Sequence, residues 1–182
     1  MNAEKMTQKA MEALEAAHAD AVRKGHPELT TLHLLQALLD QEHGLTGNLL
    51  GKMGKDPGML KQAVSEELGK LPTFNGASGR VAASGGMNQV LVRSDDEAKQ
   101  LGDEYVSVEH LLLAILEEGK SGPAGRLLQE QSIRRKELLK TLEDVRGGQR
   151  VTNRNPEDTF EALEKYGSDL TLLAREGKLD PV

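Results

Sequence analysis

The feature that most constrains the fold is an internal duplication of one helical unit. Residues 32–39 match residues 109–116 at an offset of 77, and both segments contain the pattern His-Leu-Leu-x-Ala. After one inserted residue the offset becomes 78. A single copy has too little apolar surface to be stable alone, so two copies packed about a pseudo-twofold axis are expected to share one core. The matched positions include His33 with His110, Leu14 with Leu91, Gly25 with Gly102, and Leu60 with Leu138.

Each copy is predicted to contain four helices, which makes the fold class all-α. Leu and Ala recur at helical spacing, and aromatic residues, which favour strands, make up only 2% of the chain. Thr7, Ser84, Ser107 and either Thr30 or Thr31 are the expected helix N-caps. The expected helices cover residues 8–24, 32–39, 46–53 and 57–68 in the first copy, and 85–101, 108–118, 124–130 and 134–145 in the second.

Clusters of Gly, Ser, Asn and Pro indicate how the chain is organised. A double-repeat domain is expected over residues 1–148, followed by a linker with flexible stretches at 147–148 and 153–156, and then by the beginning of a further helical module that is cut short. Whether the chain from Gln149 onward is ordered is left open by the sequence. The boundaries within this scheme are repeat one at 1–72, a connection at 73–86, repeat two at 87–148, the linker at 149–156, and the helical tail at 157–182.

Charge and composition exclude several classes of partner. The net charge is −6 and the Lys and Arg residues are scattered, whereas nucleic-acid binding requires a basic patch. No apolar run approaches the roughly 18 residues of a membrane span, and the N-terminus lacks the apolar core of a signal peptide. Cysteine is absent, which is compatible with a reducing compartment. We therefore expect a cytoplasmic protein that binds neither nucleic acid nor membrane.

No motif for catalysis or cofactor binding is found. Gly119-Lys120-Ser121 is similar to the end of a phosphate-binding loop, but Ala114 stands where that motif requires Gly, and the segment follows a helix instead of a strand. The five histidines form no pair one helical turn apart with a carboxylate on the same face. His33 and His110 occupy the same repeat position, so packing beside a leucine-rich face explains them better than metal ligation.

The end of the chain resembles a known family. Residues 165–171, Lys-Tyr-Gly-Ser-Asp-Leu-Thr, and 177–182, Gly-Lys-Leu-Asp-Pro-Val, are similar to the beginning of the first AAA+ ATPase module of Clp family unfoldases. The doublet resembles the repeated Clp N-terminal domain. The linker Gly-Gly-Gln-Arg-Val-Thr at 147–152, followed by Asn-Pro-Glu-Asp-Thr at 155–159, is most similar to ClpB-type disaggregases of the Clp family.

The resemblance implies a module that engages unfolded or aggregated polypeptide and passes it to a threading motor. By the same resemblance, the parent protein is a homohexameric stress-response chaperone with a coiled coil, it uses ATP and magnesium, and it cooperates with the DnaK chaperone system. The 182 residues themselves are expected to be monomeric, to bind no cofactor and to hydrolyse no ATP, because the motor's phosphate-binding loops would follow Val182.

Positions at which the two copies differ are the candidates for binding. Val90-Leu91-Val92 replaces Ala13-Leu14-Glu15, which puts three consecutive apolar residues where a two-sided helix exposes at least one. Asp103 replaces His26 and Glu109 replaces Leu32, so acidic side chains are expected to rim an apolar groove and to favour clients bearing Lys or Arg. The candidate groove residues are Thr7, Val90, Leu91, Val92, Asp103, Glu109 and His110.

Structural explanations exist for the same residues. Thr7 serves as a helix cap, the valines cover the glycine-rich connection, Asp103 lies in a turn, and Glu109 favours a helix N-terminus. Three other functions also remain open. These alternatives to a polypeptide-binding module are a docking domain for one folded adaptor, the regulatory part of an ATPase, and a helical spacer in which the Val90–Val92 patch is buried.

Overall fold

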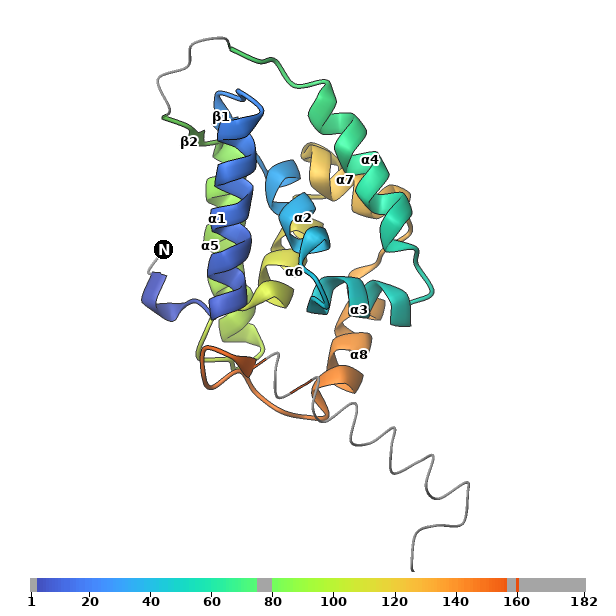
Figure 1. Cartoon of the computed structure of the whole chain (residues 1–182). Helices are drawn as coiled ribbons and strands as arrows, with labels where there is room; N and C mark the ends of the chain where they lie inside the picture. The colour runs from blue at the N-terminus through green and yellow to red at the C-terminus, as the bar shows by residue number, and fades with distance from the viewer. Residues whose placement is uncertain (1–2, 75–79, 157–159, 161–182) are drawn as a thin grey trace, which may run out of the picture.

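The computed structural model describes residues 3–74, 80–156 and 160. Within these residues the chain forms eight α-helices, four in each copy, so the predicted all-α fold is confirmed (Figure 1). The first copy contains α1 (Gln8–Arg23), α2 (Thr31–Asp40), α3 (Leu45–Lys52) and α4 (Pro57–Gly69). The second copy contains α5 (Gly85–Gln100), α6 (Val108–Glu118), α7 (Pro123–Glu130) and α8 (Arg135–Arg146), and short 3-10 turns cover Ala3–Lys5 and Gly119–Ser121.

The predicted caps are confirmed at equivalent positions of the two copies. The Thr7 hydroxyl accepts a hydrogen bond from the N–H of Ala10 at 3.2 Å, and the Ser84 hydroxyl accepts one from the N–H of Met87 at 3.1 Å. Each bond satisfies a backbone donor that the first turn of α1 or α5 leaves without a helical partner. The cap of α2, which the sequence left open, is Thr30.

Two short parallel β-bridges join the copies, and the pseudo-twofold axis relates one bridge to the other. Strand β1 (Glu28–Leu29) pairs with β2 (Ala82–Ala83), and Met6 pairs with Val106. The 77-residue offset exchanges one bridge with the other. The next hydrogen bond along each bridge is also repeated at 2.9 Å, from the N–H of Ser84 to Leu29 and from the N–H of Thr7 to Val106. These bridges were not predicted, because two-residue strands have no periodicity to detect.

The shared core lies around α2 and α6, which occupy the middle of the molecule in Figure 1. All residues of α6 from 108 to 116 are buried, and all of them except Glu109 and His110 are apolar, as expected for a helix enclosed on every side. Helices α1 and α5 pack on one side of this pair, and α3, α4, α7 and α8 cover the other. None of the described helices is long and apolar enough to span a membrane.

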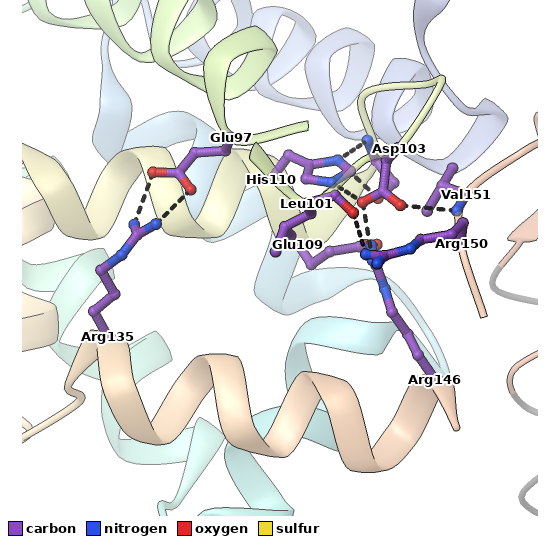
Figure 2. Close-up of polar contacts among 10 residues, drawn as sticks. Glu97, Leu101, Asp103, Glu109, His110, Arg135, Arg146, Arg150 and Val151 are labelled. Carbon is purple, nitrogen blue, oxygen red and sulfur yellow. Dashed lines mark hydrogen bonds and ion pairs between the residues drawn. The ribbon is translucent and has the colours of Figure 1, made fainter. Parts of the chain in front are cut away.

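An ion-pair cluster fixes the start of α8 to the rest of repeat two. Arg135 donates two hydrogen bonds of 2.7 Å to the two carboxylate oxygens of Glu97 on α5 (Figure 2). It also donates to Glu117 on α6 at 3.1 Å. The Glu97 carboxylate is nearly buried, at 7% side-chain exposure. A bidentate pair of this kind sets the angle at which α8 leaves the core.

The segment after α8 packs on the doublet. In the predicted linker, residues 149–156, the side chain of Val151 is fully buried. Residues 75–79 of the predicted connection, and residues 157–182 of the predicted tail apart from Phe160, lie outside the described residues.

Candidate binding surface and buried charge cluster

The predicted apolar patch on α5 is partly exposed. Val90 is buried at 2% exposure, Leu91 is half-buried against the core, and Val92 is exposed at 66%. Consecutive helical residues point about 100° apart, so the three side chains pass from the core to solvent. Glu15, the counterpart of Val92 in repeat one, is also exposed. Repeat two therefore exposes valine at a position where repeat one exposes a carboxylate.

The acidic residues lie in the interior, which corrects the expected exposed rim. Asp103 and Glu109 are 8% and 1% exposed, and His110 is fully buried. They share a charge cluster with Arg146, a residue at the end of α8 that the sequence did not single out (Figure 2). Thr7 is also buried and serves as the cap of α1. The structure therefore does not place the predicted groove residues on an open surface together with Val92, because all four named here are buried: Thr7, Asp103, Glu109 and His110.

Asp103 is the centre of this cluster. One of its carboxylate oxygens accepts hydrogen bonds from His110 Nε2 at 2.6 Å and from Arg146 Nη1 at 2.9 Å. The other oxygen accepts the backbone N–H of Val151 at 2.9 Å. Arg146 Nη2 also donates to Glu109. Two buried carboxylates are thus compensated by a single guanidinium and by hydrogen bonds, as buried charges require.

The position of His110 in a capping box fixes its tautomer. The N–H of Ser107 donates to His110 Nδ1 at 2.8 Å, so this nitrogen carries a lone pair and the proton lies on Nε2, which donates to Asp103. His33 repeats the arrangement in the first copy, where its Nδ1 accepts the N–H of Thr30 at 3.0 Å. The matched histidines in the sequence are therefore explained by capping boxes, an unusual use of His at this position.

The two copies differ in what the second histidine nitrogen meets. In repeat one, His33 Nε2 lies 2.8 Å from His26 Nδ1. In repeat two, the equivalent nitrogen of His110 contacts the carboxylate of Asp103 instead. Burial lowers the pKa of His33 to about 4, with a further contribution from the positive charge that His26 would carry. Burial and the nearby Lys24 also lower the pKa of His26. This pair is therefore neutral at pH 7.

The electrostatic balance around Asp103 favours the carboxylate. Burial acts to raise its pKa, but hydrogen bonds from His110 and Val151 and the charge of Arg146 outweigh that effect and hold the pKa below its ordinary value. For Glu109, burial is likewise opposed by His110 and Arg146, and the pKa is again lowered. Burial acts to lower the pKa of Arg146, but the charges of Glu109 and then Asp103 raise it. Asp103, Glu109 and Arg146 are therefore ionised at neutral pH.

Two open grooves in the described part of the chain are lined by none of the predicted binding residues. One, of about 530 Å³, lies between α1 and α2 and has Lys9, Asp20 and Asp40 among its lining residues. The other, of about 660 Å³, lies between the end of α6 and the start of α8. Among the described residues no cluster of three or more His, Cys, Asp or Glu side chains has the arrangement of a metal site.

Comparison with known proteins defines the class of this doublet. The family described as the Clp repeat (R) N-terminal domain matches residues 5–131, so the chain belongs to this family. Its curated relatives include the chaperone protein ClpB of Nitratidesulfovibrio vulgaris, at 50% identity over 185 residues, and that of Bacillus anthracis, at 43%. Each alignment covers the whole chain, which spans about a fifth (21%) of the length of these relatives.

Solved structures have the same fold at lower identity. The N-terminal domain of Hsp104 from Candida albicans superposes with a TM-score of 0.74 at 24% identity, over 84% of this chain and 98% of that one. The N-domain of ClpV from Vibrio cholerae gives a TM-score of 0.61 at 22% identity, over 78% of this chain and 84% of that one. This chain thus shares its fold with both of these solved domains.

Proposed function

We propose that this doublet is a polypeptide-binding module that captures unfolded or aggregated chains through the exposed apolar face of α5. The observation that supports it most directly is Val92, at 66% exposure beside half-buried Leu91. Solvent-exposed apolar side chains on a rigid helix can bind unfolded segments without reading their sequence. The proposal rests on Leu91 and Val92, because the other predicted residues are buried.

The size of this face sets the expected strength. Complete burial of one valine contributes about 1.5–3 kcal/mol, and half-buried Leu91 adds less than a fully exposed leucine would. Binding also has an entropic cost, since an unfolded client loses backbone freedom where it is ordered. A single contact would therefore be weak, and several doublets acting on one client would hold it more tightly.

The activity of the whole protein is part of this proposal. The relatives are ClpB chaperones about five times longer than the chain, so a motor would lie in the part that this chain does not cover. In this scheme the doublet delivers clients to a hexameric ATP-driven threading motor that uses magnesium and cooperates with the DnaK system. The doublet supplies capture, and the chemistry occurs elsewhere.

The test compares two exposed valines. Val92→Ser is expected to weaken binding of a reduced, carboxymethylated and therefore permanently unfolded test protein by at least threefold in calorimetry. The matched control is Val22→Ser on α1, because Val22 is the other exposed valine among the described residues, at 42%, and lies outside the proposed face. Equal affinities for the two variants, with unchanged helicity, would contradict the proposal.

Docking of one defined partner is the second candidate. An N-domain of ClpV with the same fold, at 22% identity and a TM-score of 0.59, has been solved as a complex with a VipB peptide. That precedent favours a specific peptide or adaptor. The two functions differ in stoichiometry, because an adaptor-docking domain would bind one partner at a one-to-one ratio. Such a domain would also show no binding to the carboxymethylated test protein.

A further inference from the structure

The segment that leaves α8 is attached to the doublet at Val151. This segment, residues 150–154, is called the exit strap here. The N–H of Val151 donates to the Asp103 carboxylate at 2.9 Å, and its carbonyl accepts the N–H of Glu104 at 2.9 Å. Its side chain is fully buried. Backbone and side chain of this one residue are thus both held, between the flexible stretches predicted at 147–148 and 153–156.

The other end of the strap crosses to repeat one. The carbonyl of Arg154 accepts the N–H of Gln8, the first residue of α1, at 2.8 Å. The guanidinium of Arg154 donates to the carbonyl of Met6 at 3.3 Å and lies 3.0 Å from the sulfur of Met11. Arg150 also donates to the carbonyl of Leu101 at the end of α5. The exit strap therefore spans both copies beside the bridge that joins Met6 to repeat two.

The charge cluster is the anchor of the strap. Asp103 uses one oxygen for His110 and Arg146, and it uses the other for Val151 (Figure 2). Arg146 also lies over the ring of Phe160, with its guanidinium carbon 5.7 Å from the ring centroid. The proposed binding face does not involve this cluster, so client capture does not explain why the charges are buried. Attachment of the exit strap does.

Repeat one provides an internal comparison. Its own exit also returns to the turn after the first helix, since the N–H of Phe74 donates to the carbonyl of Gly25 at 2.9 Å. Phe74 is 61% exposed, however, and His26 occupies the position of Asp103. The exit of repeat one thus lacks both the buried side chain and the carboxylate. The change from His to Asp between the copies coincides with the attachment of the strap.

We propose that the exit strap is a releasable tether, held by Asp103 and Val151, that controls how far the doublet reaches from the module that follows. The contacts are one buried valine and a few hydrogen bonds, set against the backbone entropy of five ordered residues, so the strap can open while the helices stay folded. Fully extended, residues 149–156 would span about 26–29 Å. This inference rests on the proposed function, because the tether matters only if a motor follows.

Tryptic cleavage after Arg150 and Arg154 reports on the strap in the full chain. The protection factor is the cleavage rate of a free peptide of residues 147–156 divided by the rate in the protein. We expect a protection factor of at least 100 after Arg150, and Val151→Ser, compared with its own peptide, lowers it at least tenfold at unchanged melting temperature. Arg154→Ala, which removes the contacts with Met6 and Met11, also lowers it.

Two further variants separate the anchor from general stability. Asp103→Asn leaves one acceptor oxygen where the cluster and the strap need two, and it is expected to lower protection. Glu97→Gln weakens the nearly buried pair with Arg135, which does not contact the strap, and should leave protection unchanged. A protection factor near 1 in the wild type, or equal factors in Val151→Ser and the wild type, would overturn the proposal. Client binding by Val92 is measured separately, so either proposal can fail alone.

Discussion

The His26–His33 pair gives a quantitative prediction for stability at mildly acidic pH. The pKa of His33 is lowered from 6.5 to about 4 in the folded protein, so the unfolded chain takes up a proton that the folded chain resists. The stabilisation is fully present above pH 6.5 and is lost as the pH falls through that window towards 4. One proton corresponds to about 1.4 kcal/mol per pH unit, which gives a loss of about 2 kcal/mol between pH 7 and pH 5.

The assay is urea unfolding followed by circular dichroism at pH 7 and pH 5. Asp103 and Glu109, whose pKa values are also lowered, add to acid sensitivity chiefly below about pH 4.5, near their ordinary values. The histidine pair therefore dominates above pH 5. His26 has a lowered pKa as well, and its effect has the same sign.

Substitution of His26 by Asp converts repeat one to the arrangement of repeat two. The new carboxylate would accept the Nε2 proton of His33, as Asp103 accepts that of His110, and would raise the pKa of His33. We expect the loss of stability between pH 7 and pH 5 to fall by more than half. His43→Asn is the control, because His43 is exposed and asparagine tolerates its positive φ of 54°. An equal loss in wild type and His26→Asp would refute the reasoning.

Two other substitutions test the interior, each by urea unfolding. Arg146→Ala leaves Asp103 and Glu109 buried without their cation and should cost about 3–5 kcal/mol, and a loss below about 1 kcal/mol would show that the cluster is not buried. Gly125→Ala places a Cβ 2.6 Å and 2.7 Å from backbone atoms of Gly119, so it should destabilise α7 strongly. Gly47→Ala on α3 has no atom within 4 Å of the added Cβ and should stabilise by about 0.5–1 kcal/mol.

Local features of the sequence were sufficient for most of the fold. Thr7 and Ser84 were predicted as caps because a cap depends on residues within one helical turn, and the structure confirms both. The duplication predicted the pseudo-twofold packing because equivalent helices must bury equivalent faces. The bridge between Met6 and Val106 needed the structure, since it joins residues 100 positions apart with no distinctive pattern.

The candidate site was predicted less well, for a physical reason. Asp103 and Glu109 were predicted to rim a groove because the two copies differ at these positions. Their partner Arg146 is 43 and 37 residues away, and only tertiary packing brings its guanidinium to them. The exit strap was missed for a similar reason, because glycines before Val151 indicate flexibility while the pocket that holds Val151 is formed by other segments.

Chemical-shift mapping with the carboxymethylated test protein is the most direct test of the central claim that α5 captures unfolded chain. The account predicts that the largest changes in amide shifts occur at Leu91, Val92 and their neighbours on α5, and that Val92→Ser reduces them while Val22→Ser does not. The account would be contradicted by changes confined to the groove between α1 and α2, or by no changes at a saturating client concentration.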